Sequence, residues 1–517
     1  MTTAPTVARG DIHEELLDRI ATARLGGSEQ NRRRHVAAGK LLVRDRLALL
    51  LDDVEEFEDG LLARHADGLP ADGVVTCVGT VDGRRVCVIA NDYTVKAGTW
   101  GKRTFEKITR MQLLADEIGA PLVYLVDAAG ARIDEQFESY AGRHAWGNIF
   151  YNQVQISGRV PQICALFGPS PAGSAYVPAL CDVIIMVRGT ATAYIGSPRV
   201  AEMVTGEKVT LEEMGGAELH SRVSGLSDLL AETEEEAIAA IRLYLSYLPS
   251  SWTEHPPRVA AREPRPVASI RDVVPADQAT PYDVRDLIDA VVDADSFFEH
   301  KELFAPELVT GFARLGGEPV GIVANQSAVK AGVLFSDSSD KAARFVWMCN
   351  AYNVPLLFLV DVPGYMLGTA AEREGIIRHG AKMLFAVAES RVPRIAVIVR
   401  KAYGGGYLGM SGSPMNPDAV LALPTAKPAL LGPEAAISGI HYNRIMAVTD
   451  EKERQALVAQ LRAEYEEKID VFQIANENAV EAVVSYERLR DELIARYRVY
   501  RNRVKALPAR RNGVYPV

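Results

Sequence analysis

The stretch that decides the fold is Arg400–Gly409, which reads RKAYGGGYLG. It follows the apolar run Ile395–Val399, which is typical of a buried strand. Helical spacing resumes only later, so the glycines Gly404–Gly406 are predicted to lie at a strand-to-helix turn. Glycine at such a turn lets the backbone take positive φ and approach a ligand closely. Backbone N–H groups there can hold a developing negative charge on one oxygen. The stretch alone therefore predicts either an oxyanion hole or a tight turn.

The same arrangement occurs earlier in the chain, at residues 160–176, which read VPQICALFGPSPAGSAY. Val160-Pro161 matches Val392-Pro393, and Gly173 matches Gly405 at the same spacing. Further matches upstream, without a gap between Val86 and Gly130, pair Val95–Gly98 with Val329–Gly332 and Leu125–Asp127 with Leu359–Asp361. The series predicts an internal duplication, in which each half carries a strand, a turn and a candidate oxyanion hole.

Short β-rich runs and one helical segment alternate in the first half. Val86–Ala90 and Leu122–Asp127 are predicted strands, and Thr104–Ile118 between them is a predicted helix. This order implies a parallel sheet with a crossover helix. The loop Ala128–Arg132 follows the second strand, at the sheet edge where ligands collect in open α/β sheets. We therefore expect an α/β fold of two tandem domains related by duplication.

The domain limits follow from composition. Residues 1–250 are predicted to form the N-terminal domain and residues 282–517 the C-terminal domain. Residues 251–281, rich in proline and charge, are the predicted linker. From Thr449 the chain is predicted to be helical and to end in a basic tail, which includes Arg496, Arg498, Arg501, Arg503, Arg510 and Arg511. We expect this tail to be exposed to solvent or to pack against another subunit.

Composition and missing motifs exclude several classes of protein. The chain has 517 residues, enough for two cores, and its net charge of −10 argues against nucleic-acid binding. Its five cysteines show no CxxC spacing, which favours a reduced, cytoplasmic setting. We find no signal peptide and no apolar run long enough to span a membrane.

Known catalytic motifs are also missing. There is no phosphate-binding GxxxxGK[ST] loop, no GxSxG and no Met-Lys-Met that would carry biotin. The histidines His144, His220, His379 and His441 have no metal-ligand spacing, so they are interpreted as structural and no metal is expected.

At this point the residues point to a family. The chain, from about Glu14 to Arg503, resembles the carboxyltransferase β subunit of biotin-dependent acyl-CoA carboxylases, of the propionyl-CoA and methylcrotonyl-CoA kinds. The matching phrases are Gly39-Lys40-Leu41, Arg44-Asp45-Arg46, Asn91-Asp92, Thr94-Val95-Lys96, Gly130-Ala131-Arg132, Pro178-Ala179-Leu180, Val204–Glu207, Val360–Tyr365, Lys401–Gly405 and Glu464–Lys468. The resemblance implies two crotonase-like domains.

The resemblance also implies a division of labour. A separate α subunit, with biotin carboxylase activity and a biotin carboxyl carrier, would carboxylate biotin with ATP and bicarbonate. This subunit would move the carboxyl group from carboxybiotin to the α-carbon (or vinylogous carbon) of an acyl-CoA. The family builds its site where the N-domain of one subunit faces the C-domain of a partner, in a homohexamer of two stacked trimers.

By family position, the N–H groups of Gly405 and Gly406 would hold the enolate oxygen of the acyl-CoA. Those of Ala172 and Gly173 would hold the ureido oxygen of biotin. The ureido anion itself would then take the α-proton, so no side-chain base is required. The residues implied to bind substrate are Gly130, Ala131, Arg132, Tyr176, Tyr407 and Leu408.

The sequence departs from the family pattern at three places. Ala128-Ala129 replace the Ser-Gly that often precedes Gly130, and Ala172 adds a Cβ beside the first hole. Leu408 stands where Asp or Ile is common. If Leu408 lines the pocket rather than the core, it predicts acyl groups larger than acetyl.

Three other functions stay open. The chain could be the carboxyltransferase subunit of a decarboxylase or transcarboxylase, which runs the same half-reaction backwards. It could be a non-catalytic scaffold that binds CoA esters, although the intact Gly404–Gly406 argues against this. It could be a crotonase-type hydratase, although one domain would suffice and no catalytic glutamates are evident at the turns.

Overall fold

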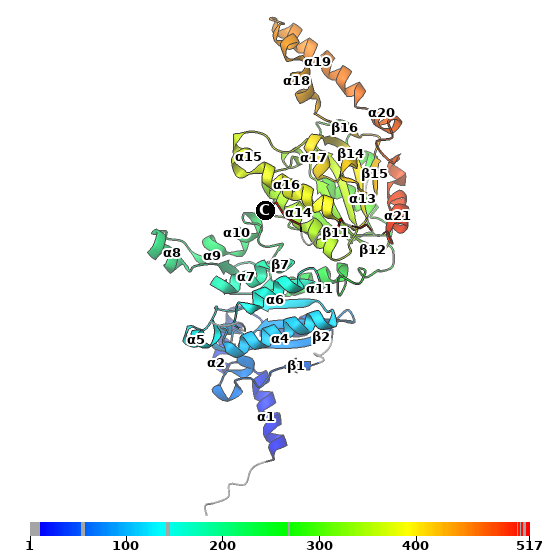
Figure 1. The fold of residues 1–517 in the computed structure, drawn as a ribbon. Coiled ribbons are helices and arrows are strands. Elements are labelled where there is room, and N and C mark those ends of the chain that lie inside the picture. The colour runs from blue at the N-terminus through cyan, green and yellow to red at the C-terminus, as the bar shows by residue number, and fades with distance from the viewer. Residues whose placement is uncertain are drawn as a thin grey trace, which may run out of the picture. The chain divides into compact units, whose positions relative to one another are not determined.

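The computed structural model describes residues 11–52, 57–140, 145–266, 269–503, 505–506, 508–509 and 513–516. The chain divides into two compact units, of which the first ends at Glu254 and the second begins at His255. Each unit contains a central sheet with helices on its faces (Figure 1). His144, Arg510 and Arg511 lie outside the described residues.

The first unit is built on a seven-stranded sheet of order β1-β2-β3-β4-β5-β7-β9. The strands from β1 to β3 pair antiparallel, and those from β3 to β9 pair parallel. Its central strands are apolar and buried along their whole length, as expected for a sheet covered on both faces. The strands are β1 (Phe57–Asp59), β2 (Val74–Val81), β3 (Arg84–Asn91), β4 (Leu122–Val126), β5 (Gln162–Leu166), β7 (Val183–Val187) and β9 (Leu229–Ala231), with β6 (Pro169–Pro171) and β8 (Thr192–Tyr194) forming a separate pair.

Helices of the first unit connect and cover these strands. The crossover helix α4 buries Phe105, Ile108, Met111 and Ala115 at helical spacing and ends at Gly119, whose φ is 63°. The helices are α1 (Ile12–Arg24), α2 (Glu29–Ala37), α3 (Val43–Leu50), α4 (Lys102–Ile118), α5 (Gln136–Ser139), α6 (Asn148–Ile156), α7 (Tyr176–Ala179), α8 (Pro198–Thr205), α9 (Leu211–Gly215), α10 (Ala217–Arg222) and α11 (Glu234–Tyr247). Short 3₁₀ turns are η1 (His65–Asp67), η2 (Pro70–Gly73), η3 (Lys96–Gly98), η4 (Ile133–Glu135) and η5 (Ala172–Ala175). The predicted strand–helix–strand segment is confirmed by β3, α4 and β4.

The second unit has a sheet of order β10-β11-β12-β13-β14-β15-β17, with β16 paired to the end of β14. The pairs from β10 to β12 are antiparallel, and those from β12 to β17 are parallel. The strand order and pairing thus follow the same pattern in both units. The strands are β10 (Phe298–His300), β11 (Leu308–Leu315), β12 (Glu318–Asn325), β13 (Leu356–Val362), β14 (Arg394–Tyr403), β15 (Ala419–Ala422), β16 (Lys427–Ala429) and β17 (Ala482–Val483).

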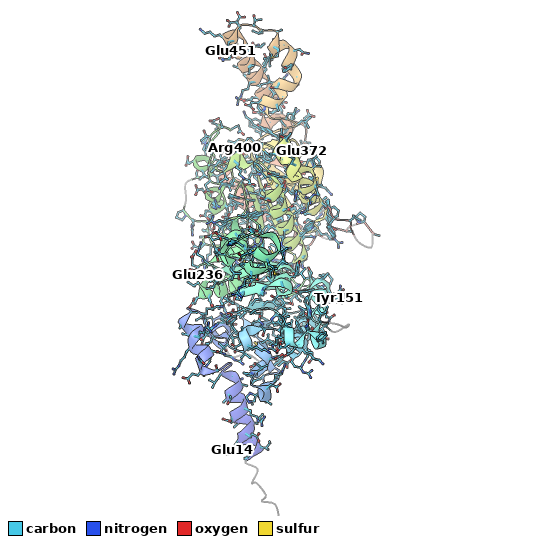
Figure 2. All side chains as sticks on the ribbon, turned by 90° about the vertical axis from the view of Figure 1, so that its left-hand side faces the viewer. Glu14, Tyr151, Glu236, Glu372, Arg400 and Glu451 are labelled. Atoms are coloured by element: carbon cyan, nitrogen blue, oxygen red, sulfur yellow. The ribbon has the colours of Figure 1, made fainter. Side chains whose placement is uncertain are left out.

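Helices of the second unit cover its sheet, while α18 and α19 extend away from it (Figure 1). The long helix α19 has one buried residue, Leu461. Figure 2 labels Glu451, at the first turn of this helix. The helices are α12 (Ile270–Val273), α13 (Val284–Val291), α14 (Ser336–Ala351), α15 (Thr369–Glu374), α16 (Ile376–Glu389), α17 (Gly404–Gly409), α18 (Pro433–Met446), α19 (Glu451–Lys468), α20 (Val471–Asn476) and α21 (Leu489–Tyr500), with 3₁₀ turns η6 (Lys330–Gly332), η7 (Ser413–Met415) and η8 (Tyr486–Arg488).

Much of the segment predicted as a linker, 251–281, packs on the second unit. The N–H of Val259 donates to the carbonyl of Gly317 at 3.0 Å. Ile270 and Val274 join the apolar core beneath the second sheet. Residues of the predicted basic tail also have partners, because Arg496, Arg501 and Arg503 form ion pairs with Glu492, Glu318 and Asp418.

Candidate functional site

The glycine turn at the end of β14 opens the short helix α17. Gly404 has a φ of 51°, in the left-handed region that favours glycine. Gly405 is exposed, and Gly406 is buried so closely that a Cβ there would lie 2.8 Å from Val362 Cγ2. The first N–H groups of a helix have no acceptor within it, and Tyr403 provides no side-chain cap. The turn therefore presents backbone donors at an exposed glycine.

A buried ion pair fixes the strand that leads into this turn. Arg400 is fully buried, and its guanidinium donates twice to Asp361 Oδ2, at 2.8 and 3.0 Å. The other oxygen of Asp361 accepts the N–H of Lys401 at 3.1 Å. Lys401 Nζ lies 3.7 Å from the same oxygen, and burial lowers the pKa of this lysine. Asp361 is the next-to-last residue of β13, so it holds the last part of β14, just before the glycine turn.

The earlier turn also begins with a left-handed residue, which is alanine instead of glycine. Ala172 begins η5 after β6 and has a φ of 52°, which matches the 51° of Gly404. A left-handed φ is strained for alanine. At the spacing that pairs Gly173 with Gly405, Ser174 takes the place of Gly406. Ser174 is buried and donates its hydroxyl to the carbonyl of Pro171 at 2.6 Å.

Buried charges also hold the carboxyl edge of the first sheet. Asp127, which is fully buried, lies 2.7 Å from Lys40 Nζ and 3.0 Å from Arg46 Nη2. Arg46 also donates to both oxygens of Glu234, at 2.7 and 2.8 Å. Glu234 begins α11 in a row of glutamates, a pattern typical of an acidic first helix turn. It is instead the buried partner of an arginine far away in the chain.

The loop after β4 lies against the first turn. A Cβ at Gly130 would lie 3.2 Å from Pro171 Cγ, and Ala131 is exposed beside it. The side chain of Arg132 is buried, with Nη1 2.5 Å from Asp72 Oδ1 and 3.3 Å from Glu135 Oε1. The guanidinium thus fixes the loop from inside. Of the three residues Gly130–Arg132, only Ala131 is exposed.

The remaining predicted site residues lie on the short helices that follow the two turns. Tyr176 begins α7 and is 52% exposed. Tyr407 is half-buried, and its hydroxyl lies 3.0 Å from Ser413 Oγ and accepts the N–H of Ser413. This contact anchors η7 to α17. Leu408, the next residue, is half-buried.

Two other turns, which the repeat pairs with each other, also have a left-handed backbone. Lys96–Gly98 and Lys330–Gly332 each place three consecutive residues at positive φ, including the alanines Ala97 and Ala331. Such strain persists only where surrounding structure imposes it, and it clusters at functional sites. The carbonyl of Ala97 accepts the N–H of Ala129 at 3.0 Å, which joins this turn to the loop of Gly130. In the sequence, only the third residue of each turn, Gly98 or Gly332, is of a type that favours the left-handed conformation.

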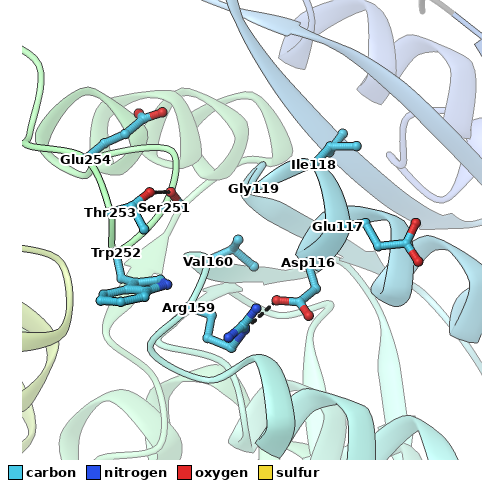
Figure 3. A pocket seen from close by; sticks show the side chains of 10 residues that line it. All are labelled: Asp116, Glu117, Ile118, Gly119, Arg159, Val160, Ser251, Trp252, Thr253 and Glu254. Carbon is cyan, nitrogen blue, oxygen red and sulfur yellow. Dashed lines mark hydrogen bonds and ion pairs between the residues drawn. The ribbon is translucent and has the colours of Figure 1, made fainter.

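A surface pocket in the first unit lies at the other end of the strands. Its volume is about 310 Å³, and Figure 3 shows Arg159 pointing to Asp116, with Nε 2.5 Å from Oδ1. Gly119 and Val160 in its lining precede β4 and β5, so it is separate from the carboxyl edge. Within the described ranges, no three His, Cys, Asp or Glu residues are grouped to hold a metal. Nor is any helix of the described part long and apolar enough to cross a membrane.

Comparisons with known proteins identify the family of this chain. The carboxyl transferase domain model matches residues 34–515. The chain is 53% identical to "Uncharacterized carboxylase YngE" of Bacillus subtilis, covering 98% of this chain and 99% of that protein. It is 41% identical to the propionyl-CoA carboxylase carboxyltransferase subunit of Haloferax mediterranei, over 98% and 99%.

Solved structures give the same relationship. A crystal structure of transcarboxylase 12S, described as a hexamer with methylmalonyl-coenzyme A bound, matches with a TM-score of 0.92 and 38% identity, over all of both chains. The mixed α/β fold with parallel sheets is that of crotonase-like carboxyltransferases. The chain belongs to the carboxyl transferase family and is a biotin-dependent acyl-CoA carboxyltransferase subunit.

Proposed function

We propose that this subunit forms an acyl-CoA enolate at the second turn, with the N–H groups of Gly405 and Gly406 as the oxyanion donors. The observation that carries this proposal is an exposed glycine in the first turn of α17, beside N–H groups that lack intrahelical acceptors. Preorganised N–H donors stabilise an enolate oxygen by several kcal/mol. Removing one donor from an oxyanion hole costs a comparable amount of transition-state stabilisation. Asp361 and Arg400 keep the turn in place while the charge develops.

The first turn fits the ureido oxygen of biotin. Ala172 is exposed, and Pro171 provides no side-chain cap for the N–H groups of η5. Ala172 and Gly173 are the proposed donors, and the loop of Gly130, where a Cβ would lie 3.2 Å from Pro171 Cγ, borders the same place. Carboxybiotin, carried by a partner chain, supplies the carboxyl group. The residues of this chain orient the ureido oxygen and require no side-chain base.

The buried ion pairs set the role of Arg132. Its guanidinium is occupied by Asp72 and Glu135, so we propose that Arg132 positions the Gly130 loop and does not contact the substrate. Tyr407 similarly positions α17 through Ser413. Tyr176 and Leu408, which retain exposed surface, are the proposed side-chain contacts of the substrates.

Assembly and domain structure complete the proposal. We infer that each unit is one crotonase-like domain of a duplicated pair, supported by the common strand order and by φ values of 52° and 51° at Ala172 and Gly404. The proposed domains are 1–250 and 282–517, connected by 251–281. Assembly as a homohexamer of two trimers is supported by the hexameric transcarboxylase 12S relative. All five cysteines are buried, which supports a cytoplasmic setting.

The direction of carboxyl transfer, to the acyl-CoA or away from it, is a separate part of the proposal. Relatives named methylmalonyl-CoA decarboxylase and methylmalonyl-CoA carboxyltransferase share about as much sequence with this chain as the propionyl-CoA carboxylases do. We propose carboxylation with an α subunit that carries biotin carboxylase activity and the biotin carboxyl carrier.

Recovery of the chain's natural partner decides between these directions. The complex would be purified through this chain, probed with streptavidin for a biotinylated partner, and assayed with ATP, bicarbonate and propionyl-CoA. We expect ATP-dependent carboxylation by the complex and none by this chain alone. Bicarbonate fixation by the single chain would contradict the proposal, as would a biotinylated partner that supports only decarboxylation.

A further inference from the structure

Tyr365, which follows β13, has no role in the proposed mechanism, yet its backbone is firmly held. The N–H of Leu334 donates to the carbonyl of Gly364 at 3.0 Å, and the N–H of Met366 donates to the carbonyl of Leu334 at 2.8 Å. Leu334 itself is fully buried. Tyr365 therefore leaves the carboxyl edge of the second sheet from a fixed position.

The ring of Tyr365 is enclosed by glycines of α16 and α17, two helices that lie next to each other (Figure 1). A Cβ built on Gly380, inside α16, would lie 3.2 Å from Cε1 of the ring, and one on Gly405 would lie 3.5 Å from Cδ2. A Cβ on Gly409, the last residue of α17, would lie 2.5 Å from the hydroxyl oxygen, closer than non-bonded atoms approach. The ring thus contacts both helices.

The ring explains why two of these positions are glycine. Gly380 and Gly409 are both buried, and neither has a positive φ. Both lie in helices, where alanine is more favourable than glycine. The backbone conformation therefore does not require glycine at either position. The close approach of the Tyr365 ring does.

The hydroxyl of Tyr365 contributes mainly its volume to this packing. It is directed to Met383 Sδ at 3.8 Å, and a thioether sulfur is a weak acceptor. Burial raises the pKa of the phenol, so it stays neutral at physiological pH. Removing the oxygen should leave the ring in place and make room beside Gly409, because the next ring atom, Cζ, lies 3.4 Å from the Cβ position there.

The residues just before Tyr365 pack against the same short helix. A Cβ on Gly406 would lie 2.8 Å from Val362 Cγ2 and 2.9 Å from the Cα of Gly364. Together with the Tyr365 ring, these contacts make residues 362–365 the surface that supports α17. The position of the glycine turn therefore depends on this segment.

An aromatic ring also lies against the first turn. A Cβ on Gly173 would lie 2.8 Å from Trp146 Cζ3. Trp146 belongs to the segment just before α6, whereas Tyr365 belongs to the loop after β13. The two units thus pack a ring on the turn from different places in the chain, which favours a role for the ring in holding the turn.

We propose that Tyr365 is a positioning residue, whose ring locks α17 against α16 and keeps the backbone donors of the turn where the reaction requires them. This inference rests on the proposed function of Gly405 and Gly406. Tyr365 itself does not contact the reacting atoms. Donors are effective when they are fixed before charge develops, and a misplacement of about 1 Å can slow a reaction about 10²-fold. A shift of the ring should lower kcat and spare KM, because these hydrogen bonds strengthen only in the transition state.

A pair of substitutions tests this role through the size of the ring. The full chain would transfer the carboxyl group of methylmalonyl-CoA to free biotin, with kcat and both KM values measured. Gly409→Ala should lower kcat about tenfold or more, because its Cβ displaces the ring, and should leave both KM values within about twofold. Tyr365→Phe should keep kcat within about twofold. The double variant should recover kcat to within about threefold of the wild type, since the clashing oxygen is gone.

The matched control is Gly439→Ala in α18, where an added Cβ would meet no atom within 4 Å. It should behave like the wild type. A Gly409→Ala enzyme with wild-type kcat, or a double variant as slow as Gly409→Ala alone, would overturn the positioning role. If Gly409→Ala does not fold, Tyr365→Leu, which removes the ring and keeps Gly409, should show the same loss of kcat. An unchanged kcat in that variant would also overturn the role.

Urea denaturation gives a readout without turnover. Gly409→Ala should lower the urea midpoint of the wild type, but it should leave unchanged or raise the midpoint of Tyr365→Phe, where no clash opposes the helix preference of alanine. A wild type that transfers no carboxyl group, or a Gly405→Val variant with normal turnover, would refute the proposed function. The urea midpoints would still decide whether the ring and Gly409 are coupled, and independent effects of the two substitutions would overturn the inference.

Discussion

Gly405 and Gly406 differ in what their missing side chains allow. Gly406 is packed against Val362 and Gly364, whereas a Cβ at Gly405 would meet Tyr365 only at ordinary contact distance. The positive φ of the turn belongs to Gly404. A side chain introduced at position 405 would therefore not strain the backbone, and it would occupy the space next to the proposed N–H donors.

Replacing Gly405 tests the oxyanion hole without disturbing the fold. In Gly405→Val the branched side chain would occupy the place of the enolate, so we expect kcat to fall by about 10²-fold or more, as when an oxyanion donor is lost. The control Gly405→Ala should lose less, because its single Cβ fits against Tyr365. Steady-state kinetics on folded variants provide the measurement. A Gly405→Val enzyme with near-normal turnover would remove this residue from the site.

Ala172 carries strain that glycine would relieve. A left-handed φ costs a non-glycine residue roughly 1–2 kcal/mol. We expect Ala172→Gly to raise the free energy of unfolding of the first unit by about 1 kcal/mol. The matched control is Ala175→Gly in the same turn, where φ is −65° and glycine should destabilise by about 0.5–1 kcal/mol. Urea denaturation of both variants checks the prediction, which fails if the two shift in the same direction.

Leu408 tests substrate preference. If this half-buried side chain lines the acyl pocket, its apolar surface should favour propionyl or larger groups over acetyl. One methylene in such a pocket changes kcat/KM by roughly 10–200-fold. A ladder of acetyl-, propionyl-, butyryl- and longer acyl-CoAs should therefore be ranked differently by the wild type and Leu408→Asp. Identical ranking would place Leu408 in the core.

At the level of elements, features that depend on neighbouring residues could be predicted from the sequence, whereas contacts between distant residues could not. The strands β3 and β4, the helix α4 and the glycine turn after β14 followed from runs of neighbouring residues, because strand burial and helical spacing depend on local pattern. The pairing of Arg46 with Glu234 and the packing of Trp146 on Gly173 join distant positions, and no local pattern indicates them. Arg132 lies in the phrase Gly130-Ala131-Arg132, which resembles the family. Its burial against Asp72 results from tertiary packing, which the phrase does not indicate.

The crossover helices of both units contain a buried lysine. Lys107 of α4 donates to the carbonyls of Ala71 and Gly60, and Lys341 of α14 donates to the carbonyl of Phe304 at 2.8 Å. Burial lowers the pKa of Lys107 to about 8 and that of Lys341 to about 7. Each helix is thus fixed to the loops beneath it by an ammonium group that burial makes easier to deprotonate.

This lowered pKa gives a pH dependence with a defined sign. Between about pH 7 and 10 the unfolded chain keeps a proton on Lys341 that the folded unit tends to lose, so stability should rise with pH in that window. We expect the stability of wild type relative to Lys341→Met to increase by on the order of 1 kcal/mol per pH unit. Urea midpoints at several pH values measure it, with the exposed Lys452→Met as control. A difference that stays constant or falls with pH would contradict this account.

At the level of the whole molecule, the central claim is that the two turns of this chain suffice for carboxyl transfer, without ATP. The sequence contains no phosphate-binding loop and no Met-Lys-Met biotin motif, and in our proposal a partner chain carboxylates biotin. In the proposed mechanism, transfer between an acyl-CoA and biotin needs only backbone N–H donors, which we place at Gly173 and Gly405.

The most direct measurement uses the purified chain with methylmalonyl-CoA labelled in its free carboxyl group, an excess of free biotin, and no ATP, bicarbonate or partner. The account predicts that propionyl-CoA and labelled carboxybiotin form together, at a rate that falls about 10²-fold or more in Gly405→Val and much less in Gly405→Ala. Absence of transfer by the folded wild-type chain, or transfer at the same rate by Gly405→Val, would contradict it.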